Sequence, residues 1–258
     1  MKKAVIFLFT SCCGLAVQLS WAQQTSADVV TILRASLAAQ TGQKVIQDVT
    51  LTGNAESIAG SDDERVPFAF KGTLSGSTRT DINLSSGTLS ELRTVDSAGP
   101  AGTWSRGDGQ QHSVAGHNLI TDPAWCSPVL LLERLVSNSA ALVSYIGTED
   151  GLVHFRSVQP APAGTPATSA PLVQHLGQMD LYLDPKTFLP VRLSFSTHAD
   201  DNALLDIPVR VEFSNYQTVY GVTQPMRVQR YVNGSLALDL RIENVTVNSG
   251  LSSASLLN

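Results

Sequence analysis

Histidine is the residue type in this chain that most readily suggests a metal or catalytic site. His112 and His117 lie five residues apart in "QHSVAGH", so on a strand their side chains would point to opposite faces. His154, His175 and His198 are isolated along the sequence. No His-x-Glu, Cys-x-x-Cys or His-Glu-x-x-His spacing occurs. We therefore predict that the protein has no metal site.

Nucleophilic and phosphate-binding chemistry have equally little support. The serines of "SGS" (75–77) and "SSG" (85–87) are typical of turns, and no Gly-x-Ser-x-Gly elbow is present. The glycine-rich "GPAGTWSRGDGQ" lacks the lysine of a phosphate loop. The acids of "SDDERVP" lack the ligand spacing of a calcium loop. We predict a protein that is not an enzyme, with no catalytic residues and no cofactor.

The N-terminus has the pattern of an export signal. Met1-Lys2-Lys3 precedes an apolar run that ends with the small residue Ala22, which predicts a signal peptide over residues 1–22, cleaved after Ala22. The run is interrupted by polar residues and is short for a membrane span of about 20 apolar residues. "FTSC" before Cys12 loosely resembles a lipoprotein cleavage box, so anchoring at Cys12 is a minor alternative. We expect a periplasmic or secreted mature protein.

Charge and cysteine content restrict the possible partners and the source of stability. The net charge is −5, and loss of Lys2 and Lys3 with the signal peptide would make it more negative. No basic cluster stands out, which argues against nucleic acid as a partner. Cys126 is the one cysteine outside the predicted signal peptide, so a disulfide framework is excluded. We expect Cys126 to be a buried, unreactive residue.

Two segments have the apolar periodicity of short amphipathic helices. The first is "SADVVTILRASLAAQTG", with Ser26 as its N-cap and Gly42 as its end. The second is "SPVLLLERLVSNS", with Ser127 as its N-cap and Pro128 at its first position. The leucines of the second helix could form a fixed part of the core or a lid, a helix that a ligand displaces. The sequence leaves both interpretations open.

Most of the remaining chain alternates between apolar and polar residues, as strands do. Asn233-Gly234 predicts a two-residue hairpin, Gly221 predicts another turn, and Pro225 is expected where the following strand begins. About a dozen strands cannot remain flat, so the sheet must curl and its concave apolar face must be covered. We predict a mainly β (α+β) fold, a strongly curved antiparallel sheet or half-barrel, with the short helices covering the concave face.

The domain organisation follows from the same pattern. Residues 23–258 are predicted to form a single half-barrel domain. The Pro/Ala-rich segment 160–171 is interpreted as a mobile loop within it, because strands of the same style continue on both sides. An inter-domain linker is the alternative for this segment.

Several segments resemble the LolA-like superfamily of bacterial envelope proteins, which includes the lipoprotein carrier LolA and the proteins LolB and RseB. They are "MDLYLDPKTFLPVRLSFST", "VEFSNYQTVYGVTQPMRVQRYVNG" and "LDLRIENVTVNSGL", together with the signal peptide and the early helix. The resemblance covers residues 179–251 and, loosely, the first helix; residues 99–171 are not covered. It implies a half-barrel around an apolar cavity that holds acyl chains under helical lids. The functional arginine of the carrier matches no position here.

The resemblance and the pattern together predict a periplasmic, non-enzymatic carrier that binds a hydrophobic ligand, a lipid or the acyl chains of a lipoprotein. The alternative is an envelope sensor or scaffold that uses the same fold to bind a partner protein. The predicted ligand-binding residues of the concave face are Val191, Leu193, Phe195, Val209, Val211, Phe213, Leu238 and Leu240, with Leu131 and Leu135 from the lid helix. The sequence does not decide which face of each strand is concave.

Overall fold

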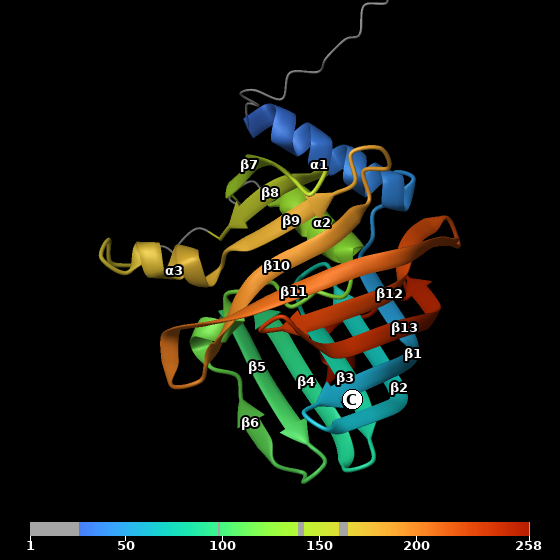
Figure 1. Cartoon of the computed structure of the whole chain (residues 1–258), viewed down its shortest axis with the longest axis vertical. Coiled ribbons are helices and arrows are strands. Elements are labelled where there is room, and N and C mark those ends of the chain that lie inside the picture. Colours follow the sequence, from blue (N-terminus) through green and yellow to red (C-terminus); the bar gives the residue numbers. More distant parts are fainter. Residues whose placement is uncertain (1–25, 98, 139–141, 160–164, 258) are drawn as a thin grey trace, which may run out of the picture.

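Thirteen strands form one antiparallel sheet in the order β6-β5-β4-β3-β2-β1-β13-β12-β11-β10-β9-β8-β7. The computed structural model describes residues 26–97, 99–138, 142–159 and 165–257. Within them the sheet curves strongly, with β6 and β7 as its two free edges (Figure 1). The predicted fold class, a curved antiparallel half-barrel with short helices, is confirmed. The predicted signal peptide, its cleavage after Ala22 and the alternative anchor at Cys12 lie outside the described residues.

The elements follow one another mostly as hairpins. The strands are β1 (Asp48–Ala59), β2 (Asp62–Thr73), β3 (Thr78–Leu84), β4 (Gly87–Asp96), β5 (Gly99–Arg106), β6 (Gln111–Ser113), β7 (Leu142–Glu149), β8 (Leu152–Val158), β9 (Met179–Leu183), β10 (Pro190–Ala199), β11 (Asn202–Val219), β12 (Val222–Val232) and β13 (Ser235–Val247). The helices are α1 (Ser26–Thr41), α2 (Pro128–Ser137) and α3 (Ala170–Leu176), with 3-10 turns η1 (Gly116–Leu119) and η2 (Ser253–Leu256). Across the described ranges, none of the helices has the length and apolar character needed to span a membrane.

The turns of the last third form where glycine and asparagine permit positive φ. Asn233 and Gly234 have φ of 50° and 79° and join β12 to β13, as predicted. Gly221 turns the chain between β11 and β12. The predicted position of Pro225 is wrong, because β12 begins at Val222 and Pro225 lies inside it, opposite Tyr216. Proline offers no N–H to the ladder, and β11 is irregular beside it, where Asn215 has φ of 56°.

The core of the molecule lies between the inner face of the sheet and α2. In Figure 1, α2 is seen behind β9 and β10, inside the curve. Most apolar side chains of α2 are buried, namely Val129, Leu130, Leu131, Leu132 and Leu135, and Val136 is partly buried. They belong to one apolar cluster with inward-facing residues of both halves of the sheet, among them Val49, Leu51, Phe68, Phe70, Phe155, Leu181, Leu193, Val211, Val228 and Leu240. A short helix therefore covers the concave face, as the sequence predicts.

Polar groups fix α2 in this position. The Oε1 of buried Glu133 accepts a hydrogen bond from the backbone N of Ile46 at 2.8 Å. Arg134 forms an ion pair with Asp122 and donates from Nη1 to the backbone O of Thr73 at 3.1 Å. The helix is thus tied to three separate parts of the chain.

The N-terminal end of α2 differs from the prediction in one respect. Pro128 begins the helix, as predicted, and Ser127 occupies the N-cap position. The hydroxyl of Ser127 makes no capping hydrogen bond, however, and is buried without a partner among the described residues. Burial of this turn takes precedence over the usual capping geometry.

Helix α1 packs on α2, β12 and β7 and lies across one end of the half-barrel (Figure 1). Val29 and Leu33 bury its apolar side. Ser36 and Gln40 are also buried, yet their side-chain polar atoms have no hydrogen-bond partner within the described parts of the chain. The same holds for Gln224 on β12, which α1 contacts. The contact of α1 therefore includes buried polar groups that are costly to leave unpaired.

Helix α3 was not predicted. Residues 160–164 of the predicted mobile loop lie outside the described residues, but Ala170 and Pro171, its last two residues, begin α3. The helix has seven residues, and Leu176 is its buried side chain. A helix this short, with one buried residue, produces no apolar periodicity that a sequence could reveal.

A buried carboxylate holds the end of the chain against the start of the sheet. Asp48, at the first position of β1, is 2% exposed. Its oxygens accept hydrogen bonds from the backbone N and the Oγ of Ser249, both at 2.8 Å, and from the backbone N of Gly250 at 2.9 Å and of Leu251 at 3.2 Å. Four donors on one carboxylate offset the cost of burying its charge.

We expect Asp48→Ala to lower the free energy of unfolding by about 3 kcal/mol, because it leaves several buried donors without an acceptor. Urea unfolding followed by circular dichroism measures the change. Asp62→Ala, at an exposed position of β2, is the matched control and should be close to neutral. Equal stability of the two variants would show that the C-terminal segment is not held by Asp48.

Candidate functional site

A pocket of about 190 Å³ opens beside the core, where β3, β4 and β5 come near β12 and β13. We call it the tryptophan pocket. Its lining residues are Thr80, Ile82, Leu89, Glu91, Trp104, Arg106, Trp125, Arg230 and Leu238. Ile82 and Leu238 belong to the buried core, and Leu89 and Trp125 pack against it. The floor of the pocket is therefore continuous with the apolar inner face of the half-barrel.

Two tryptophans and two arginines define the chemistry of this pocket. The guanidinium of Arg230 lies over the ring of Trp125, 5.1 Å from its centroid. Arg106 lies over Trp104 at 5.5 Å, and His112 stacks on the same ring at 4.3 Å between centroids. Each indole thus carries a cation on part of its surface. The pocket offers broad apolar surfaces next to positive charge.

The positive charge of Arg230 is only partly offset by neighbouring groups. Its Nε is buried and has no hydrogen-bond partner among the described residues. The carboxylate of Glu91 is already bonded to Arg93, at 2.7 Å from its Nε. Burial lowers the pKa of Arg230 below its ordinary value; the charge of Glu91 opposes this effect and that of Arg93 adds to it. A guanidinium in such surroundings is suited to an anionic group brought by a ligand.

Most of the predicted ligand-binding residues lie on the inner face of the sheet. Leu193, Val209, Val211, Phe213, Leu238 and Leu240 are buried in the same cluster as Leu131 and Leu135 of α2. Phe195 is partly buried and packs against that cluster. Leu238 also lines the tryptophan pocket. The others fill the space between the sheet and α2 in this conformation.

Val191 is placed differently from the rest of the predicted set. It is half-buried and falls where the pairing of β10 with β9 shifts, between Pro190 and Arg192. Simple alternation groups Val191 with Leu193, but a register shift interrupts alternation. Local strand irregularities of this kind leave no trace in an apolar pattern.

Sequence reasoning missed the residues that form the pocket walls. Trp104, Trp125 and Arg230 are not among the residues that the sequence pattern predicts to bind a ligand. One signal was available: Met226, Val228 and Arg230 are alternate residues of β12, and the first two face the core. An arginine at an inward-facing position of a strand is a departure from alternation that points to a site.

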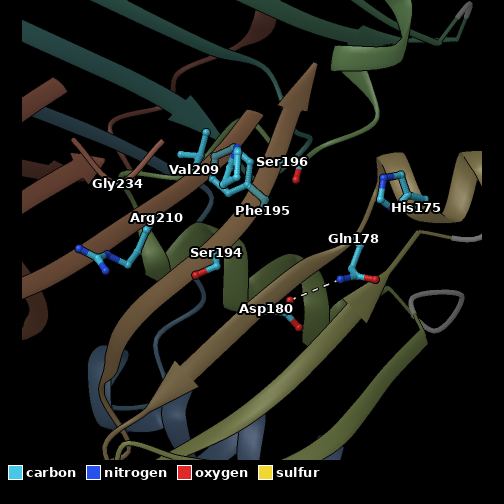
Figure 2. Close-up of a pocket in the computed structure, with 10 residues that line it drawn as sticks. His175, Gln178, Asp180, Ser194, Phe195, Ser196, Val209, Arg210 and Gly234 are labelled. Carbon is cyan, nitrogen blue, oxygen red and sulfur yellow. Dashed lines mark hydrogen bonds between the residues drawn. The ribbon is translucent and has the colours of Figure 1, made fainter. Parts of the chain in front are cut away.

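A larger pocket of about 370 Å³ lies over β9, β10 and β11 and is polar (Figure 2). Its lining residues are His175, Gln178, Asp180, Ser194, Phe195, Ser196, Pro208, Val209, Arg210 and Gly234. Asp180 bonds to Arg156 at 2.8 Å and to His154 at 2.9 Å. Burial raises the pKa of Asp180, but these two hydrogen bonds outweigh it and hold the pKa below its usual range. Polar side chains of this lining alternate with Phe195, Pro208 and Val209, and its carboxylate Asp180 is already paired with Arg156 and His154.

Comparison with known proteins gives no match by sequence: no family model and no curated protein matches this chain. Solved structures do match. A putative outer membrane lipoprotein-sorting protein domain from Vibrio parahaemolyticus aligns with a TM-score of 0.54 at 9% identity, over 88% of this chain and 95% of that one.

Two further structures agree with this match. A LolA superfamily protein from Nitrosomonas europaea has a TM-score of 0.50 at 9% identity, over 87% and 94% of the two chains. A DUF1329 family protein from Desulfovibrio piger has a TM-score of 0.54 at 11% identity, over 91% and 98%. Identities this low are informative about the fold alone. The chain has a LolA-like fold.

Proposed function

We propose that this protein is a non-enzymatic carrier of the bacterial cell envelope that binds an amphiphile, a lipid or the acyl chains of a lipoprotein, in its half-barrel. The observation that carries this proposal is the tryptophan pocket, an apolar opening beside the core of a LolA-like fold, in which the Nε of Arg230 has no hydrogen-bond partner among the described residues. The likeness to a lipoprotein-sorting domain supports the ligand class. The pattern of residues 1–22 supports export to the envelope.

The driving force would be transfer of the acyl chain from water to an apolar surface, about 0.8 kcal/mol for each buried CH₂ group. The indole faces of Trp104 and Trp125 and the side chain of Leu238 provide that surface. The pocket volume of about 190 Å³ is smaller than the range of about 300–1,000 Å³ usual for ligand sites. A long chain would therefore have to enlarge the pocket by displacing part of the helical cover.

The two covering helices differ in how firmly they are held. Helix α2 is held by the hydrogen bonds and ion pair of Glu133 and Arg134, and its leucines and Val129 are buried. Helix α1 rests on α2 and β12 through a contact that includes unpaired Gln40 and Gln224. Water could reach these amides if α1 moved away, which would recover the cost of their burial. We propose that opening begins with α1 and that α2 moves only afterwards.

The position of Arg230 narrows the proposed ligand class to amphiphiles with an anionic group. Its buried Nε lacks a partner among the described residues, and its guanidinium borders the same apolar surface that would hold the chain. A carboxylate or phosphate near this group would gain charge-assisted hydrogen bonds. In this scheme burial of the ligand's acyl chain provides affinity, and Arg230 provides selectivity for the anionic group.

Intrinsic fluorescence can test ligand binding directly. Of the three tryptophans, Trp21 lies in the predicted signal peptide, so residues 23–258 contain only Trp104 and Trp125, both in the pocket. We expect a bromine-labelled fatty acid to quench their emission saturably, because bromine quenches only at short range. The variants Trp104→Phe and Trp125→Phe assign the quenching to each indole. Leu204→Ser, at a 77% exposed position on β11, should leave the quenching unchanged.

Absence of quenching, together with native mass spectra of the envelope-purified protein that show no bound lipid, would contradict the carrier function. The alternative, an envelope sensor or scaffold that binds a partner protein through the same fold, would then be preferred.

Substitution of Arg230 separates charge recognition from chain burial. We expect Arg230→Gln to weaken binding of a fatty acid about tenfold, or about 1.4 kcal/mol, and to leave binding of the fatty alcohol of equal length unchanged. Arg65→Gln, on the exposed part of β2, is the matched control. Equal losses for the acid and the alcohol would show that Arg230 only supports the shape of the pocket.

If opening begins with α1, removing an unpaired polar group from its contact should stabilise the protein. Gln224→Met removes a buried, unpaired amide and should raise the free energy of unfolding by about 1–2 kcal/mol, while slowing ligand exchange measured by stopped-flow quenching. Gln110→Met, at an exposed position, serves as the control for the change of residue type. A destabilised Gln224→Met variant would mean that water or another group satisfies the amide.

A further inference from the structure

A cluster of histidines, unrelated to the tryptophan pocket, forms where α3 meets the ends of β10 and β11. His175 of α3 and His198 of β10 both direct Nε2 at the same oxygen, Oδ1 of Asp206 on β11, at 2.9 and 3.0 Å. The three ligand-type atoms lie within 4.8 Å of one another. The edge of His117 from η1 packs on the ring of His198, with 6.0 Å between centroids. Residues that are isolated in the sequence thus converge on one point.

The donor set and its spacing are those of a divalent transition metal. Two imidazole nitrogens and one carboxylate oxygen are typical ligands of zinc, whereas magnesium and calcium prefer oxygen ligands alone. Zinc binds such atoms at about 2.0–2.2 Å, which in a tetrahedral arrangement separates neighbouring ligands by about 3.3 Å. The two nitrogen–oxygen separations, 2.9 and 3.0 Å, are within a few tenths of an ångström of this value, and the two nitrogens lie within 4.8 Å of each other.

The cluster is held in place by the protein and is accessible from solvent. His198 is buried, and its backbone is fixed on both sides by Asn118, whose Oδ1 accepts from the N of His198 at 2.9 Å and whose Nδ2 donates to its O at 2.8 Å. The side chains of His175 and Asp206 are 48% and 42% exposed. The Nδ1 of His198 has no partner among the described residues, so the bond of Nε2 to Asp206, the packing of the ring and the fixed backbone orient this side chain.

We infer that His175, His198 and Asp206 form a binding site for a divalent transition-metal ion, with zinc as the best-fitting ion. Three protein ligands leave one tetrahedral position open to water or to an anionic group. His175 also borders the polar pocket over β9 to β11, at its α3 side (Figure 2). Metal binding would join α3 to the sheet, since one ligand comes from the helix and two come from strands.

Calorimetry and elemental analysis test this inference on tag-free protein of residues 23–258, first treated with a chelator. We expect one Zn²⁺ per chain and no comparable uptake of Mg²⁺. His175→Ala and Asp206→Asn should each weaken Zn²⁺ binding by at least about tenfold. Both positions are half-exposed, so these variants avoid the folding defect expected from removing the buried ring of His198.

His112→Ala is the matched control, because His112 is exposed on β6 and lies outside the cluster. It should retain full zinc binding. No zinc uptake by the parent protein, or uptake that His175→Ala leaves intact, would overturn the inference. The cluster would then be a hydrogen-bonded His–Asp–His group that attaches α3. Neither result of the zinc experiment depends on whether the tryptophan pocket binds a ligand.

Discussion

The structure depends on covering the apolar inner face of an open sheet. A sheet of thirteen strands that curls without closing exposes its concave side, and α2 removes that side from water. The helix can do so because its leucines face the sheet while Glu133 and Arg134 find partners at the rim. A carboxylate and a guanidinium at this depth are tolerated only because each is bonded. The same bonds fix the position of α2 against the start of β1 and the end of β2.

The proposed binding site lies where the cover that α2 forms over the inner face ends. Trp125 immediately precedes α2, so anchoring of the helix also places the indole at the edge of the core. There Trp125 meets Arg230 from β12 and lies in the same pocket as Trp104 from β5. The inner face is filled elsewhere by side chains of the core. The tryptophan pocket opens where two bulky indoles and two guanidinium groups replace aliphatic side chains.

The outer face of the same strands has the opposite character. Asp180, His154 and Arg156 form a hydrogen-bonded group on β8 and β9, and the ring of His154 stacks on Tyr182 at 4.3 Å between centroids. Such a network stiffens the sheet while leaving its outer surface polar. The apolar inner face and the charged outer face agree with a ligand site inside the curve of the sheet. The histidine cluster lies apart from the tryptophan pocket, at the end of β10.

The sequence by itself determined the parts of this protein that depend on local order. Alternation grouped Leu193, Val211 and Leu240 with the apolar faces of their strands, which the structure shows to be buried, and helical periodicity located α1 and α2 to within a residue or two. The Asn233-Gly234 turn followed from the backbone freedom of those two residues. Local patterns failed for Val191 and for Pro225, because strand register and irregular pairing depend on the neighbouring strand rather than on the chain itself.

Only the tertiary structure decided which distant residues meet. The Nε of Arg230 has no hydrogen-bond partner among the described residues, while Glu91, from the other half of the sheet, bonds to Arg93. His175, His198 and Asp206 converge because α3 packs at the ends of β10 and β11, and α3 itself is too short to be recognised from sequence. Contacts of this kind follow from the curvature of the whole sheet. No local periodicity encodes these properties, since they arise from the packing of many strands at once.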